Sequence, residues 1–231
     1  MGKRALFETD GAAPRVVIIG GGKMGEAILS GWLAQNEGVL SALSPESFVV
    51  VDPGEERRAY LEDTYQVSCL ADAREVSAEA DVVVLAVKPQ VMMDMLATIQ
   101  DKPEFANALF VSIAAGLTTE RLEEALPGGA HLVRVMPNTP LMVGKGASGV
   151  CGGSCADADE VALVRDLFGA LGVARVVDEA DMDAVCAVSG SGPAYVAAMV
   201  EALRDAGAQL GLDAQVAEDL ALQTVFGTAS L

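Results

Sequence analysis

The stretch VVIIGGGKMG, residues 16–25, decides the fold. Val16 to Ile19 are all apolar and β-branched, which is typical of a strand buried on both faces. Apolar residues then recur at helical spacing from Met24 to Leu33, so a helix begins directly after the glycines. A buried strand that turns through glycines into a helix indicates the first unit of a parallel α/β sheet.

Three glycines in this turn, Gly20, Gly22 and Gly25, have the spacing of a dinucleotide-binding fingerprint. The first allows the tight turn, the second lets a pyrophosphate approach the backbone, and the third lets helix and strand pack. Free N–H groups at the helix start would then bind the diphosphate. We assign Lys23 and Met24 to the same site, while a purely structural glycine turn remains the alternative.

The strand and helix alternation continues along the chain. The predicted strands are 48–51, 82–87, 109–113, 132–135 and 173–177, and the predicted helices include 55–63 and 156–171. Right-handed crossovers would make a doubly wound, mainly parallel sheet. We therefore expect a loose leader over 1–14, a Rossmann-type domain over 15–178 and an all-helical domain over 179–231.

The predicted helical domain contains a segment without a polar face. From Pro193 to Leu210 the apolar residues fall on nearly every side of a helix, which must then be buried all round. A partner subunit is the economical explanation, because a short helical domain does not surround its own helix. Burial within the monomer remains the alternative.

An acid at the end of the second strand bears on the choice of coenzyme. Asp52 stands where a carboxylate usually accepts hydrogen bonds from the adenosine ribose, which favours NADH. Arg57 and Arg58 follow one turn later and could neutralise a 2′-phosphate. Both NADH and NADPH therefore remain candidates.

Composition excludes several other classes of protein. The 231 residues carry a formal charge of −18, which argues against nucleic acid or an anionic membrane as partner. No apolar signal core follows Met1, and no stretch is long enough to span a membrane, so we expect a cytoplasmic protein. The four cysteines lack metal-ligand spacing and His131 is the only histidine, so no metal site is expected.

Four further motifs carry a resemblance to a known family. They are DVVVLAVKPQ from Asp81, SIAAG from Ser112, RVMPNTP from Arg134 and SGSGPAY from Ser189. In this order they resemble pyrroline-5-carboxylate reductase, a Rossmann oxidoreductase of the 6-phosphogluconate dehydrogenase-like kind. The resemblance extends over about residues 15–231.

The resemblance implies an NAD(P)H-dependent reductase that converts 1-pyrroline-5-carboxylate to L-proline, the last step of proline biosynthesis. It also implies a C-terminal dimerisation domain and a homodimer that assembles into decamers in some members. Ribose and nicotinamide would lie against the loops 86–89 and 114–116, and the substrate near residues 137–139. The residues so assigned are Ala86, Val87, Lys88, Pro89, Ala115, Gly116, Pro137, Asn138 and Thr139.

The family also has a Ser/Thr-Pro-Gly-Gly-Thr segment that holds the substrate carboxylate, and by resemblance it would follow Leu231. We therefore expect the helical domain to be incomplete, and we assign no catalytic residue. We also expect this chain to bind the coenzyme nearly as well as an extended one but to reduce the imine poorly or not at all. A non-catalytic NAD(P)-binding dimer is one alternative. Another imine or hydroxyacid oxidoreductase is a second, although a hydroxyacid dehydrogenase needs a catalytic lysine and none follows Lys145. The ring size of the imine stays open.

Overall fold

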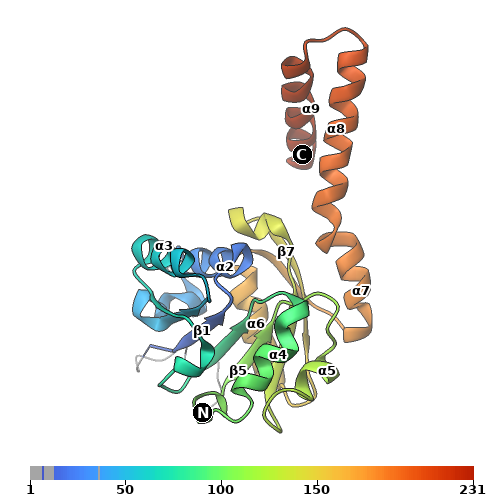
Figure 1. The fold of residues 1–231 in the computed structure, drawn as a ribbon. Coiled ribbons are helices and arrows are strands. Elements are labelled where there is room, and N and C mark those ends of the chain that lie inside the picture. The colour runs from blue at the N-terminus through green and yellow to red at the C-terminus, as the bar shows by residue number, and fades with distance from the viewer. Residues whose placement is uncertain (1–6, 8–12, 36) are drawn as a thin grey trace.

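A computed structural model describes residue 7, residues 13–35 and residues 37–231. One eight-stranded sheet forms its centre, with the strand order β3-β2-β1-β4-β5-β6-β7-β8 (Figure 1). The strands are β1 (Val16–Ile19), β2 (Phe48–Val51), β3 (Ser68–Leu70), β4 (Val82–Leu85), β5 (Leu109–Ser112), β6 (His131–Met136), β7 (Gly146–Gly152) and β8 (Gly172–Val176). Neighbouring strands are parallel except β6 and β7. The predicted mainly parallel, doubly wound sheet is confirmed.

The helices follow the strands as expected for parallel crossovers. They are α2 (Lys23–Leu33), α3 (Glu55–Tyr65), α4 (Pro89–Ile99), α5 (Thr119–Glu123), α6 (Ala158–Gly169), α7 (Met182–Val185), α8 (Gly192–Gln209) and α9 (Ala214–Ala229). Short 3₁₀ turns lie at Gly38–Ala42, Pro45–Ser47, Ala73–Glu75, Pro103–Phe105, Thr139–Val143 and Glu179–Asp181, and a π-helical turn lies at Cys186–Gly190.

Each face of the sheet has its own core. Val16 and Ile18 of β1 point to one face, where they pack in a cluster with residues of α2, α3 and α6. Val17 and Ile19 point to the other face and pack with residues of α4 and α5. Because every residue of β1 is buried, the all-apolar run of this strand is explained by a covered sheet.

Some element boundaries differ from those predicted. The strand predicted to reach Val87 ends at Leu85, and the helix predicted over 156–171 spans Ala158–Gly169. That helix begins where it does because Asp157 and Glu160 form a reciprocal capping box. Sequence analysis missed two strands, β3 and β7. β7 is rich in glycine, a poor strand former, and β3 has only three residues.

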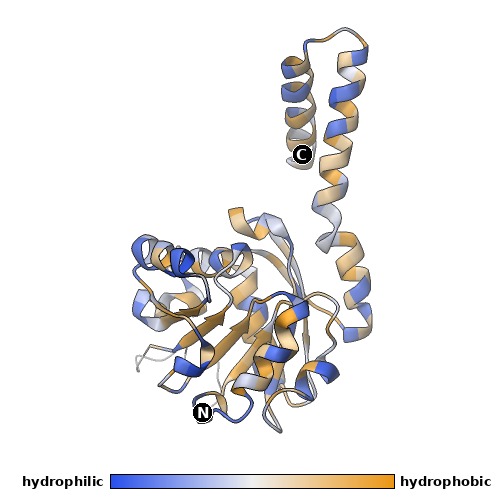
Figure 2. Cartoon of the chain, in the orientation of Figure 1, coloured by the Kyte–Doolittle hydropathy of each residue, from blue (hydrophilic) through white to orange (hydrophobic). Residues whose placement is uncertain are grey.

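The helices α8 and α9 form a hairpin that projects away from the sheet (Figure 1). They pack on each other through Gly207, where a Cβ would lie 3.1 Å from the Cβ of Ala217. No residue of α8 is buried, and large apolar side chains such as Tyr195 and Met199 are exposed. Figure 2 shows hydrophobic colouring along the projecting hairpin, whereas the hydrophobic strands lie among helices. The described residues therefore do not bury α8, which favours a partner subunit over burial within the monomer.

The predicted leader over 1–14 lies mostly outside the described residues. Within it, Phe7 is described and is 3% exposed, packed in the core cluster on the α2 side of the sheet. This position is therefore part of the folded unit and not loose. Among the described residues, none of the helices combines the length and the apolar character needed to cross a membrane.

Candidate functional site

The glycine turn between β1 and α2 contains three glycines in different surroundings. Gly20 has a φ of 109°, and a Cβ there would lie 2.6 Å from the carbonyl oxygen of Ala86. A Cβ on Gly25 would collide with the carbonyl oxygen of Gly20. At Gly22 a Cβ would meet nothing within 4 Å. Packing within the chain thus requires Gly20 and Gly25, while the space over Gly22 is open to a ligand.

The start of α2 offers backbone donors to that space. Gly22 is the N-cap, no side chain caps the helix, and the first bond of the helical ladder is Glu26 N to Gly22 O at 2.9 Å. The preceding amides have no carbonyl four residues earlier in the helix, so an anion can accept from them. Lys23 is exposed at the first position and Met24 is half-buried beside it. These groups fit the diphosphate of a dinucleotide.

Asp52 comes directly after β2 and is held by two backbone amides. Its Oδ2 accepts from Gly21 N at 3.0 Å, and its Oδ1 accepts from Gly54 N at 2.9 Å. Each carboxylate oxygen has a second lone-pair position. The carboxylate is therefore fixed beside the glycine turn and can still accept hydrogen bonds from a ribose.

Glu26 joins α2 to α3. Its carboxylate forms an ion pair with Arg57 and accepts from the hydroxyls of Tyr60 at 2.9 Å and Tyr65 at 2.8 Å. Partial burial alone would raise the pKa of Glu26, but the hydrogen bonds from Arg57, Tyr65 and Tyr60 outweigh it and lower that pKa. Burial and the bond to Glu26 raise the pKa of Tyr65 to about 12. Sequence analysis missed this cluster, because its members lie 31 to 39 positions apart.

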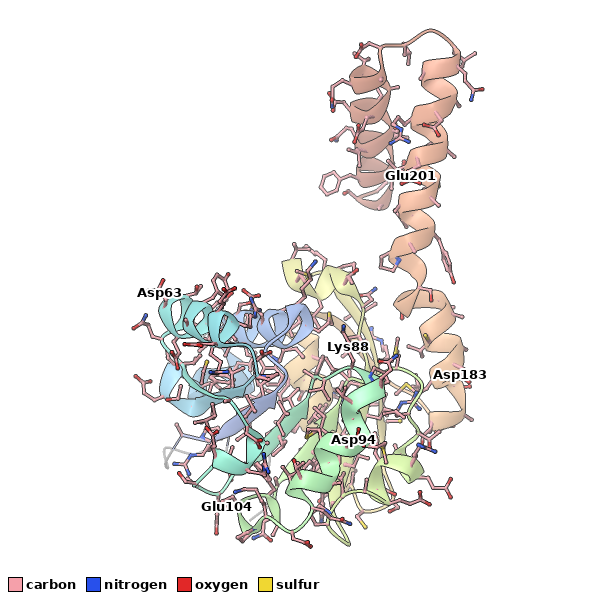
Figure 3. All side chains as sticks on the ribbon, viewed as in Figure 1. Asp63, Lys88, Asp94, Glu104, Asp183 and Glu201 are labelled. Carbon is pink, nitrogen blue, oxygen red and sulfur yellow. The ribbon has the colours of Figure 1, made fainter. Side chains whose placement is uncertain are left out.

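A pocket of about 630 Å³ lies over the carboxyl ends of β1, β2 and β4. Six predicted residues line it: Gly20, Gly22, Asp52, Ala86, Val87 and Lys88. Figure 3 labels Lys88 on the side of the sheet that faces the helical hairpin. The pocket lies where open parallel sheets bind ligands, at the edge where strands end.

Sequence analysis missed other residues of this pocket. Val91, Asp94, Met95 and Thr98 line it from one face of α4, and Asp72 lines it from the turn after β3. The signal for the α4 residues was present, because positions 91, 94, 95 and 98 share a helical face. Asp72 had no such signal, since β3 itself was missed.

Some predicted site residues lie outside this pocket. Ala115 and Gly116 are exposed after β5, and Pro89 is the first residue of α4. Pro137 is buried and Thr139 is exposed, and neither lines the pocket. Ala115, Gly116 and Pro89 nevertheless follow strands that end at the same edge of the sheet.

Asn138 joins two motifs that are far apart in the sequence. Its Nδ2 donates to the carbonyl of Ser189 at 3.0 Å, and its Oδ1 accepts from Ala147 N at 2.9 Å. Ser189 lies in the π-helical turn before α8, where Ser191 N bonds Cys186 O at 2.8 Å. Such turns often occur at functional sites. The amide of Asn138 therefore ties the start of the helical region to the sheet.

Glu179 forms a second tie at the same junction. It accepts from Thr119 N at 2.8 Å, from the Thr119 hydroxyl, and from Nη1 of Arg134, a residue only 5% exposed, at 2.9 Å. Partial burial would raise the pKa of Glu179, but the bonds from Thr119 and Arg134 lower it. The chain is thus anchored where the sheet ends and the helices begin.

Other reactive groups stand apart from the pocket. His131 is the first residue of β6, at the opposite end of the strand from the pocket edge, and its Nδ1 lies 2.7 Å from Glu160 Oε2. The four cysteines are free, and burial raises the pKa of Cys69 and of Cys151 to about 11. Across residues 13–35 and 37–231, His, Cys, Asp and Glu form no cluster suited to a metal ion.

Two family models match the chain. The model described as NADP oxidoreductase coenzyme F420-dependent matches residues 15–116, which include the glycine turn and Asp52. The model described as pyrroline-5-carboxylate reductase dimerisation matches residues 179–231, which include the helical hairpin.

Curated relatives match nearly the whole chain. A pyrroline-5-carboxylate reductase of Synechocystis sp. is 43% identical over 93% of this chain and 77% of its own length. The chain belongs to the pyrroline-5-carboxylate reductase family. A member from Corynebacterium melassecola is 40% identical over 94% of this chain and 78% of its own length.

Solved structures of the family have the same fold. The enzyme of Coxiella burnetii superposes with a TM-score of 0.84 at 34% identity, covering 94% of this chain and 79% of that one. The Plasmodium falciparum reductase, solved with NADP bound, gives 0.81 at 30% identity, covering 95% and 78%. The predicted family, the fold class and the assignment as an NAD(P)H-dependent oxidoreductase are confirmed.

Proposed function

We propose that this member of the pyrroline-5-carboxylate reductase family reduces 1-pyrroline-5-carboxylate to L-proline with NADH or NADPH. The observation that carries the proposal is the identity of 43% over 93% of the chain to a relative of that name. The glycine turn, open at Gly22 and closed at Gly20 and Gly25, supports it independently.

The residues of the pocket suit a dinucleotide that would supply the hydride. Amides at the start of α2 would hold the diphosphate, and Asp52 would accept from the adenosine ribose. We assign the loop from Ala86 to Pro89, with Ala115 and Gly116, to the ribose and nicotinamide half. These loops end strands β4 and β5, which lie side by side in the sheet.

We place the substrate beside the junction of sheet and helices, near Pro137, Asn138 and Thr139. The support is that Asn138 binds the π-helical turn of the SGSGPAY motif, so two family motifs meet there. A protonated imine is already electrophilic, so orientation and exclusion of water would supply most of the acceleration. The protein's part in the reaction is then to hold the imine carbon close to the nicotinamide.

The helical hairpin is proposed to form a homodimer. Its support is the match of residues 179–231 to a dimerisation model and the exposure of apolar side chains on α8. We propose the division into a coenzyme domain over 15–178 and a helical domain over 179–231 on the same grounds. Assembly into decamers and a cytoplasmic location stay predictions of the sequence.

A non-catalytic coenzyme-binding dimer is the competing function, and turnover separates the two. Purified protein that includes the carboxylate-binding segment expected by resemblance, mixed with 1-pyrroline-5-carboxylate and either coenzyme, should show loss of NAD(P)H absorbance with stoichiometric formation of proline. Gly22→Val is the matched control, because it should fold and fail to turn over. Coenzyme binding without any proline formed would favour the non-catalytic function.

A further inference from the structure

The turn between β2 and α3 is acidic where the adenosine ribose would lie. Asp52, Glu55 and Glu56 fall within five residues, separated only by Pro53 and Gly54. This turn supplies no hydroxyl and no cationic side chain. A 2′-phosphate placed here would meet carboxylates and find no donor among the side chains of the turn itself.

Arg57 follows this turn directly, but two of the three nitrogens of its guanidinium group are already engaged. Its Nε donates to the carbonyl of Gly21 at 2.5 Å, and its Nη2 pairs with the carboxylate of Glu26. The guanidinium carbon lies 5.0 Å from the centre of the Tyr60 ring, within the range of a cation–π contact. The side chain is only 28% exposed. Arg57 is therefore held under the glycine turn by partners on three sides.

Two further arginines near the turn are also engaged. Nη1 of Arg58 donates to the carbonyls of Asp52 at 2.8 Å and Pro53 at 2.9 Å. Arg74 pairs with Asp72, which itself lines the pocket. Lys88 also lines the pocket, but it follows β4, which β1 separates from β2.

We infer that this chain selects NADH over NADPH, and that Glu26 is a specificity-determining residue because it withholds Arg57 from the coenzyme. The inference rests on the proposed function, and it decides a choice that the sequence left open. Glu26 need not contact the ribose itself. Its carboxylate accepts hydrogen bonds from Arg57, Tyr60 and Tyr65, and the bond to Arg57 keeps that guanidinium from binding a 2′-phosphate. Asp52, whose carboxylate is held by Gly21 N, would then accept a hydrogen bond from the free 2′-hydroxyl of NADH.

The test compares the affinities of the two coenzymes. Titration of the protein with NADH and NADPH, followed by nicotinamide fluorescence, should give an NADPH dissociation constant at least about tenfold larger. Glu26→Gln removes the charge that pairs with Arg57, so NADPH affinity should rise. The ratio of the NADPH to the NADH dissociation constant should then fall by several fold. Glu62→Gln removes the same charge from an exposed position on α3 and should leave the ratio unchanged.

A second variant guards against loss of fold. Asp52→Ser removes the repelling carboxylate and adds a hydroxyl, so it should also lower the ratio of the NADPH to the NADH dissociation constant. It serves as the test if a thermal melt shows that Glu26→Gln does not fold. Equal or tighter binding of NADPH by the parent protein would overturn the inference and leave the proposed function standing. Binding of neither coenzyme would overturn both. A ratio that Glu62→Gln changes as much as Glu26→Gln would remove Glu26 from the role.

Discussion

The sheet region and the helical hairpin differ in where their apolar side chains lie. All residues of β1, β4 and β5 are buried within the chain, in clusters on the two faces of one sheet. None of the residues of α8 is buried, although the helix is rich in apolar side chains. The sheet region thus has a core of its own, whereas the apolar side chains of the hairpin fit the proposed contact with a partner.

The glycine turn repeats this contrast on a smaller scale. Gly20 and Gly25 are required by atoms of the chain itself, since a Cβ on either would strike backbone oxygens. Gly22 has open space where a Cβ would be. The open space over Gly22, at the start of α2, is where we propose that the diphosphate lies.

The largest effect is expected at the proposed dimer interface. Met199→Glu places an unpaired charge in an apolar contact, which should weaken dimerisation by about 3 kcal/mol or more. Light scattering over a range of concentrations measures this, with Met199→Leu as the conservative control. Coenzyme affinity should survive, because the pocket lies in the sheet region. A parent protein that stays monomeric at high concentration would show that the hairpin does not form a dimer interface.

A smaller loss is expected when the sheet region is overpacked at its glycine turn. Gly25→Ala forces a methyl group against the carbonyl of Gly20, so β1 and α2 must move apart. We expect the free energy of unfolding to fall by about 2 to 3 kcal/mol. Urea denaturation followed by circular dichroism checks this. Unchanged stability would mean that β1 and α2 can accommodate a methyl group at position 25.

At Gly22 the expected loss is in binding and not in folding. Gly22→Val projects into open space, so its denaturation midpoint should stay close to that of the parent. The side chain would occupy the approach of the diphosphate, and coenzyme affinity should drop by roughly 30-fold or more, about 2 kcal/mol. Fluorescence titration of the folded variant is the measurement. Parent-like affinity would place the diphosphate elsewhere.

The smallest effect concerns the junction between the two regions and depends on pH. The bonds from Thr119 and Arg134 lower the pKa of Glu179 in the folded state, so they stabilise the fold above about pH 4.5, the ordinary value for glutamate. This contribution is lost as pH falls through the lowered folded pKa, and we expect it to be small because solvent screens a partly exposed carboxylate.

Unfolding measured between pH 3 and pH 7 should therefore show a shallower acid loss in Glu179→Gln than in the parent. Glu120→Gln, at an exposed position of α5, is the matched control and should follow the parent. Identical pH profiles for Glu179→Gln and the parent would mean that the tie to Arg134 contributes nothing to stability.

Local pattern alone determined much of this protein. The β-branched run from Val16 to Ile19, the glycine spacing after it and the periodicity of α2 predicted the sheet class and the coenzyme turn, because each depends on neighbours within a few residues. The apolar helical pattern after Pro193 likewise indicated a partner subunit from sequence alone. Strand β7 was not predicted, because its glycines have low strand propensity. It forms because its pairing with β6 outweighs that propensity.

The tertiary structure alone decided which polar groups meet. Nothing in the sequence states that Arg57 pairs with Glu26, 31 positions away, or that Asn138 bonds Ser189, 51 positions away. Two arginines beside Asp52 left the coenzyme open in the sequence, and the structure places both in other contacts. The reason is physical: burial and propensity follow local pattern, whereas a hydrogen bond between distant residues depends on how the whole chain packs around it.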